Sequence, residues 1–136
     1  MKVVIDTNIL MAGLIKDSIV REILISRNIE FFLPEKAIEE IRKYQRELCK
    51  KAEYTKKEFE RLFSYLLYNL KIVSKNKIKP YMKKAEKIME KIDVDDSSFI
   101  ATCLAINADG ILTFDKHFKR QNIIKVLNIK EIIKFI

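Results

Sequence analysis

The sequence predicts an α/β fold in which a mostly parallel sheet of four to five strands lies between two layers of helices. Short apolar runs alternate along the chain with longer segments whose apolar residues recur at helical spacing. The first run, Val3-Val4-Ile5, is continuously apolar, as expected for a strand buried on both faces. No linker-like stretch and no internal repeat interrupts the pattern, so residues 1–136 are predicted to form one three-layer domain.

Five short segments are predicted as strands because they are apolar and are bounded by polar or turn-forming residues. They are residues 2–6, 30–33, 71–74, 111–114 and 125–127.

Helices are predicted between these strands from their N-terminal signals. Thr55 and Glu58 resemble a capping box, and Pro34 and Pro80 suit the first turn of a helix. The predicted helices cover about residues 17–27 (capped by Asp17-Ser18), 34–50, 55–69, 80–92 and 96–108, with a closing helix around residue 132. The lysine-rich stretch 50–91 is expected to include a helical projection within the same domain.

Composition limits the classes of protein that the chain can belong to. Among 136 residues, 49% are hydrophobic and 34% charged, which excludes a disordered chain. The net charge of +8 favours a polyanionic partner, although a lysine-rich solvated surface gives the same charge. No apolar run approaches the length of a membrane span, and no signal peptide precedes the first strand. We therefore expect a cytoplasmic protein with no membrane partner.

Two aspartates follow predicted strands, at the edge of a parallel sheet where ligands bind. Asp6 ends the first strand, and Asp115 follows the strand at 111–114, with Thr113 two residues earlier on the same side. Each aspartate could instead cap the segment that follows it.

Glu39 and Glu40 are separated by helical geometry. At about 100° per residue, Glu39 points away from the apolar face of its helix, whereas Glu40 lies on the flank of that face. Glu40 could therefore reach the end of the sheet, or form a surface pair with Lys43.

The run Asp93-Val94-Asp95-Asp96 precedes a helix and is sorted in the same way. Asp96 lies in line with Ile100 and faces inwards, while Asp95 is displaced by about 100° and is expected to be a cap or a supporting group. Asp93 lies before the helix, where it could assist.

Four carboxylates at one edge of a sheet have a chemical explanation. Oxygen ligands select hard cations such as Mg²⁺ or Mn²⁺, which neutralise their mutual repulsion and support phosphodiester hydrolysis. His117 is the only histidine, so it cannot supply the acid–base pair of a metal-independent ribonuclease, and we expect a surface or supporting role for it. Cys49 and Cys103 are isolated, which argues against a zinc site.

Three segments together resemble the PIN domain, the nuclease fold of many VapC-type toxins. They are residues 4–10 (VIDTNIL), residues 96–101 (DSSFIA) and residues 112–118 (LTFDKHF), with a weaker match at residues 37–41 (AIEEI). The cluster at 93–96 also resembles a less characterised group of prokaryotic PIN-domain proteins that are regarded as nucleic-acid-binding.

This resemblance implies roles that agree with the helical-face arguments. It implies metal-ligand and catalytic roles for Asp6, Glu40, Asp96 and Asp115, and supporting roles for Asn8 and Thr113. It also implies RNA as the substrate, cleavage to a 5′-phosphate, a homodimer and, in the toxin branch, an antitoxin partner.

Two other function classes are open to the same residues. A non-catalytic RNA-binding or protein-interaction module could keep the fold. A phosphoryl-accepting receiver domain is disfavoured, because the first strand ends in Asp-Thr-Asn and not in an acidic pair.

A basic segment with neighbouring Tyr44 and Tyr54 could contact a phosphate backbone or could be a solvated helical face. Its cations are Arg42, Lys43, Arg46, Lys50, Lys51, Lys56 and Lys57.

Overall fold

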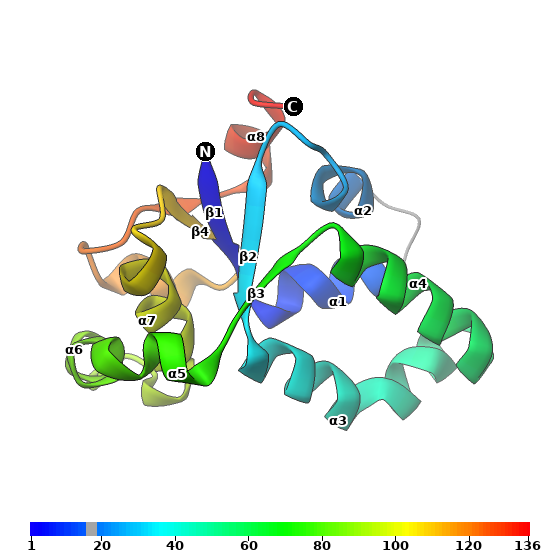
Figure 1. Ribbon diagram of the computed structural model, residues 1–136, viewed down its shortest axis with the longest axis horizontal. Helices are drawn as coiled ribbons and strands as arrows, with labels where there is room; N and C mark the ends of the chain where they lie inside the picture. Colours follow the sequence, from blue (N-terminus) through cyan, green and yellow to red (C-terminus); the bar gives the residue numbers. More distant parts are fainter. Residues whose placement is uncertain (16–18) are drawn as a thin grey trace.

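The centre of the protein is a sheet of five parallel strands in the order β3-β2-β1-β4-β5 (Figure 1). The computed structural model describes residues 1–15 and 19–136. The strands are β1 (Lys2–Ile5), β2 (Glu30–Pro34), β3 (Lys71–Val73), β4 (Gly110–Leu112) and β5 (Val126–Leu127).

The central strand is buried on both faces. Val3, Val4 and Ile5 have no exposed surface, and Val3 pairs with Phe31 on one side and Gly110 on the other. A central parallel strand is covered on both faces by helices, which explains why its sequence is continuously apolar.

Helices cover both faces of this sheet. In Figure 1, α1, α3 and α4 lie on one side and α5, α6 and α7 on the other. The helices are α1 (Thr7–Ile15), α2 (Ile19–Leu24), α3 (Glu35–Ala52), α4 (Lys56–Tyr68), α5 (Lys75–Ile78), α6 (Met82–Met89), α7 (Ser97–Ile106) and α8 (Ile129–Ile133). Short 3₁₀ turns are η1 (Lys79–Tyr81), η2 (Val94–Asp96) and η3 (Lys116–Arg120). The predicted three-layer α/β/α fold is confirmed. None of the described helices is both long and apolar enough to cross a membrane.

Local signals account for several helix boundaries. The capping box before α4 is confirmed: Glu58 N–H donates to Thr55 Oγ1 at 3.1 Å, and Thr55 N–H donates to Glu58 Oε1 at 3.0 Å. The α7 helix ends where Asn107 adopts a left-handed conformation, with φ 54°. The predicted cap formed by Asp17 and Ser18 lies outside the described residues.

Two predicted boundaries differ from the structure. The helical segment expected from Pro80 begins at Lys75, because the hydroxyl of Ser74 accepts the N–H of Lys77 and starts a helix there. The strand expected over 111–114 ends at Leu112, because Thr113 Oγ1 accepts the N–H of Asp115 and turns the chain.

The parallel arrangement brings the carboxyl ends of the strands to one edge of the sheet. Asp6 follows β1, Thr113 follows the neighbouring β4, and α3 begins directly after β2. The fold therefore gathers at this edge residues that are far apart in the sequence.

We expect Gly110→Ala to destabilise the protein by about 1–3 kcal/mol, because a methyl group there overpacks the sheet. Its Cβ would lie 2.8 Å from the carbonyl oxygen of Lys125 and 2.9 Å from Leu127 Cδ1. Urea denaturation measures the free energy of unfolding. Gly13→Ala is the matched control, since its nearest contact is the flexible end of Leu24 at 3.1 Å. Equal stability of the two variants would contradict this account of Gly110.

Candidate metal centre

Asp6 is a buried carboxylate whose two oxygens each accept a hydrogen bond. The residue is only 4% exposed. Oδ1 accepts the N–H of Ile9 at 3.1 Å, which caps α1, and Oδ2 accepts the hydroxyl of Thr113. Asp6 can therefore cap α1 and also bind a metal ion, because each carboxylate oxygen has a second lone pair for a further partner.

Thr113 joins Asp6 to Asp115. Its hydroxyl donates to Asp6 and accepts the N–H of Asp115 at 2.9 Å. Asp115 in turn accepts the N–H of His117 at Oδ1, 2.9 Å away, and so caps η3. The expected supporting position of Thr113 beside a carboxylate is the one observed, and the capping alternative for Asp115 is also realised.

Asp93 and Asp96 approach the same place from the segment before α7. Asp93 Oδ1 accepts the N–H of Asp95 at 3.1 Å and caps η2. Asp96 precedes α7 but its side chain makes no capping hydrogen bond. Asp95 is exposed, and the cap that was expected from it comes from Asp93, whose extended backbone aims the carboxylate at the turn.

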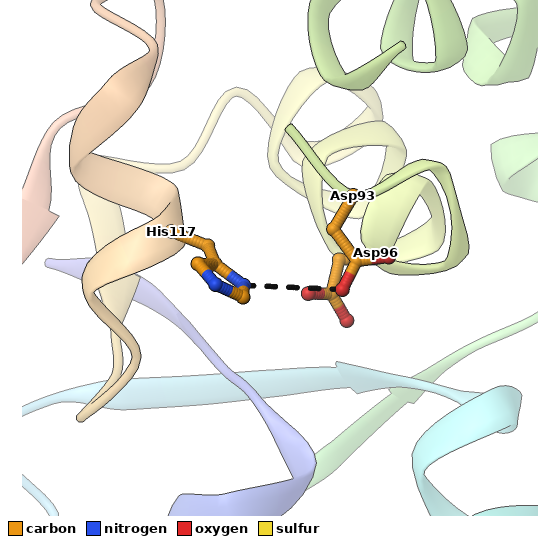
Figure 2. A group of neighbouring side chains, drawn as sticks. All are labelled: Asp93, Asp96 and His117. Atoms are coloured by element: carbon orange, nitrogen blue, oxygen red, sulfur yellow. Dashed lines mark ion pairs between the residues drawn. The ribbon is translucent and has the colours of Figure 1, made fainter. Parts of the chain in front are cut away.

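His117 faces these aspartates across the edge of the sheet (Figure 2). Its Nδ1 lies 3.4 Å from Asp115 Oδ1 and 3.9 Å from Asp93 Oδ2. One ligand atom from each of Asp93, Asp96 and His117 lies within 4.8 Å of the others. Sequence reasoning treated His117 as a surface or supporting residue. The sequence feature that could have indicated its place near the aspartates is its position two residues after Asp115, in the turn that Asp115 caps.

Glu40 and Asn8 are less closely joined to this cluster. Glu40 is half-buried, with no hydrogen bond or ion pair to another described residue, while Glu39 is exposed and pairs with Lys75. Lys36 lies one helical turn before Glu40 and donates to the carbonyl oxygen of Asp95. Glu40 is therefore one turn along α3 from the cluster. The side chain of Asn8 is exposed, whereas its backbone N–H supports the charged form of Asp6.

Burial and mutual repulsion shift the pKa values of two aspartates. Burial, and then the charges of Asp93 and Asp115, raise the pKa of Asp96 to about 6 against the weaker effect of Lys36. Burial also raises the pKa of Asp6, opposed by the hydrogen bonds from Thr113 and Ile9, and Asp115 adds repulsion. These carboxylates therefore interact as one group.

Two hydroxyl groups beside these aspartates are buried without a partner. Thr7 Oγ1 and Ser97 Oγ make no hydrogen bond in the described part of the chain, and the two residues are 5% and 1% exposed. They directly follow Asp6 and Asp96. A buried polar group without a partner is costly, and such groups are common where an ion or water binds.

This arrangement fits a hard divalent cation. The aspartates supply oxygen ligands, and a cation between them would offset the burial and the repulsion that raise the pKa values of Asp6 and Asp96. The chemistry of the cluster therefore fits a divalent cation.

Comparison with known proteins agrees with the motifs. Residues 4–126 match the PIN domain, so the chain belongs to the PIN domain family. The fold is similar to that in the crystal structure of VapBC2 from Rickettsia felis bound to a DNA fragment from their promoter. This match has a TM-score of 0.70 and 21% sequence identity, over 94% of this chain and 98% of that chain. No curated protein matches the sequence.

We expect Asp96→Asn to stabilise the metal-free protein at pH 7 by about 1 kcal/mol, after allowance for solvent screening. An acid whose pKa is raised on folding, here from 3.8 to about 6, binds its proton more tightly in the folded state. Stability then falls as the pH rises through this window. The extra stability of Asp96→Asn over the wild type should disappear near pH 4.

Urea denaturation in EDTA at pH 4 and pH 7 measures this difference. Asp95→Asn is the control, because Asp95 is an exposed neighbour. A stability difference between Asp96→Asn and the wild type that does not change with pH would contradict the assigned repulsion.

Proposed function

We propose that the chain is a divalent-metal-dependent endoribonuclease. The observation that carries the proposal is that Asp6, Asp96 and Asp115 lie together at the carboxyl edge of a PIN-domain sheet, where Thr113 is hydrogen-bonded to Asp6 and to the N–H of Asp115. Burial raises the pKa of Asp6 and of Asp96, and the charge of Asp115 adds to both shifts. Partly buried carboxylates gathered in one place destabilise a fold unless a cation binds between them, so this arrangement favours function over stability.

In this proposal Asp6, Asp96 and Asp115 hold Mg²⁺ or Mn²⁺, and Glu40 reaches the site from α3. Such an ion, when bound, activates water and stabilises charge on the phosphate. The protein's own residues fix the position of the Asp6 carboxylate. Thr113 fixes one oxygen of Asp6, and the N–H of Ile9 fixes the other. These bonds hold Asp6 in one rotamer before any substrate binds.

RNA is the proposed substrate because the net charge is +8 and basic side chains gather along α3 and α4. A cavity of about 680 Å³ along α3 and α4 is lined by Arg42, Lys43, Arg46 and Lys56, with Glu47 and two uncharged residues. Arg42 is already engaged: it pairs with Glu60 and lies 4.7 Å over the ring of Phe63. Lys43 and Arg46 are exposed, and we assign phosphate contacts to them.

The aromatic residues expected beside this basic segment differ in availability. The hydroxyl of Tyr54 accepts a hydrogen bond from Arg21 at 3.2 Å, which ties the ring to α2. Tyr44 is 38% exposed, with Lys43 over its ring at 5.6 Å. Phe114 is 54% exposed and directly precedes Asp115. We therefore assign base stacking to Tyr44 and Phe114 in preference to Tyr54.

Toxin–antitoxin pairing and a cytoplasmic location are proposed from the same resemblance. The likeness of the fold to VapBC2 supports an antitoxin partner. We assign the acidic site as the surface that this partner covers. For a homodimer we assign the surface where α4 meets the edge strand β3, because Tyr65, Tyr68 and Ile72 expose apolar area there.

Asp6→Asn and Asp96→Asn are each expected to lower RNA cleavage by about 100-fold or more, because each removes a negatively charged ligand. Cleavage of a labelled single-stranded RNA, with Mg²⁺ or Mn²⁺ and with EDTA, measures the effect. Activity that survives EDTA and both substitutions would reject the mechanism. Salt-dependent RNA binding without cleavage across several metals would favour the alternative, a non-catalytic RNA-binding module.

Glu40 and Glu39 provide a matched pair within this experiment. Glu40→Gln should reduce cleavage strongly, whereas Glu39→Gln should leave it within about twofold of the wild type, since Glu39 is an exposed residue paired with Lys75. Equal effects of the two substitutions would remove Glu40 from the proposed site.

The combined substitution Lys43→Ala and Arg46→Ala should weaken RNA binding and lower its salt dependence. Loss of two contacts to single-stranded phosphates reduces the slope of log affinity against log salt by about 1.4. Fluorescence anisotropy in EDTA, where cleavage is absent, measures both quantities. Lys83→Ala with Lys87→Ala, two exposed lysines of α6, is the control pair. An equal slope for both pairs would indicate a dispersed charge effect.

A further inference from the structure

His117 is placed among carboxylates by elements that leave it little freedom. Phe118 is buried, and its ring meets that of Phe99 of α7 edge-on at 6.5 Å. This contact fastens η3 to α7, the helix that Asp96 precedes. The N–H of His117 is held by Asp115 at 2.9 Å. The backbone of His117 is thus anchored on both sides while its ring remains 53% exposed.

The ring meets oxygen atoms that have room for another partner. The side chain of Asp96 makes no capping hydrogen bond with the described residues of α7, which leaves its oxygens available to another partner. Asp93 uses Oδ1 for the N–H of Asp95, and its Oδ2 is the atom that lies 3.9 Å from His117 Nδ1. Figure 2 shows the three side chains pointing toward one another from two separate segments.

The spacing of these atoms is close to that of ligands on one ion. Ligands bound to one ion at about 2.1 Å are about 3 Å apart when adjacent and about 4.2 Å apart when opposite. The ligand atoms of Asp93, Asp96 and His117 lie within 4.8 Å of one another, so small side-chain rotations would bring them to bonding distance. The buried hydroxyl of Ser97, which directly follows Asp96, has no hydrogen-bond partner among the described residues, so a polar atom is available beside the cluster for a further partner.

We propose that Asp93, Asp96 and His117 bind one first-row transition-metal ion, such as Mn²⁺ or Co²⁺, in preference to Mg²⁺. This inference rests on the proposed function, whose metal it specifies. Carboxylate and water suit Mg²⁺, whereas an imidazole nitrogen adds affinity that grows along the series from Mn²⁺ to Co²⁺ and Ni²⁺. A purely carboxylate site would lack this selectivity. Asp93 thereby acts as a ligand in addition to capping η2.

An ion pair between His117 and the aspartates is the competing interpretation. It predicts that His117 contributes only charge, so its loss would alter the binding of all divalent ions in the same direction and by a similar factor. A ligand role predicts a selective loss and a nitrogen directly coupled to the metal. The two interpretations are therefore separated by spectroscopy and by comparison of ions.

The test uses the full chain freed of metal and reloaded with Mn²⁺, Co²⁺ or Mg²⁺ in turn. Electron spin echo spectroscopy of the Mn²⁺ form should show modulation from a coordinated ¹⁴N, and His117→Ala should abolish it. By calorimetry, His117→Ala should lower the affinity for Co²⁺ by about tenfold or more and that for Mg²⁺ by less than about twofold. Lys119→Ala, in the same turn, should retain both properties, and His117→Gln provides a second variant if alanine disturbs folding.

Absence of the ¹⁴N signal in the Mn²⁺-loaded wild type would overturn the inference, as would equal losses of Co²⁺ and Mg²⁺ affinity. These results are independent of nuclease activity. RNA cleavage without a ¹⁴N signal would leave the proposed function standing and remove His117 from the metal. A ¹⁴N signal without cleavage would support the ligand set and count against the ribonuclease.

Discussion

The hydrogen bond from Thr113 to Asp6 is the interaction on which the edge of the sheet depends. It links the ends of β1 and β4, two adjacent strands that are 107 residues apart at this contact. The same hydroxyl accepts the N–H of Asp115, so one small side chain sets the position of two carboxylates and ends β4. Valine at this position would fill a similar volume but would leave Oδ2 of the buried Asp6 without the donor that Thr113 supplies. The site is therefore built by a polar contact inside an otherwise apolar sheet.

Residues with strong local signals were predicted well from the sequence. Thr55 and Glu58 marked the start of α4, and the apolar run after Lys2 marked β1, because caps and buried strands are determined by neighbouring residues. Boundaries that depend on side chains bonding to the backbone were predicted less well. Ser74 begins a helix before Pro80, and Thr113 shortens β4. Such hydrogen bonds compete with regular structure through a single hydroxyl, so periodicity does not reveal them.

The candidate site also contains residues whose positions follow from the sequence pattern and one residue whose position does not. Asp6, Asp96 and Asp115 were predictable because a parallel sheet brings its carboxyl ends together, and the position of each relative to a strand or helix decides its direction. His117 was not predictable in this way. Its place opposite Asp93 depends on the packing of Phe118 against Phe99, a contact between segments that no periodicity connects. Metal-ligand roles for all of these residues remain predictions for experiment.

The distribution of charge explains how a basic protein contains an acidic centre. The net charge is +8, yet Asp6 and Asp96 lie near Asp93 and Asp115, and burial together with the neighbouring carboxylates raises the pKa of Asp6 and of Asp96. Lys36 opposes the repulsion only in part, because its ammonium group donates to the carbonyl oxygen of Asp95 and not to a carboxylate. A polyanion attracted by the surrounding lysines would meet this negative region unless a cation neutralised it. Binding of a divalent ion would therefore do more than supply ligand bonds, because it would also lower the electrostatic repulsion between a phosphate backbone and this edge of the sheet.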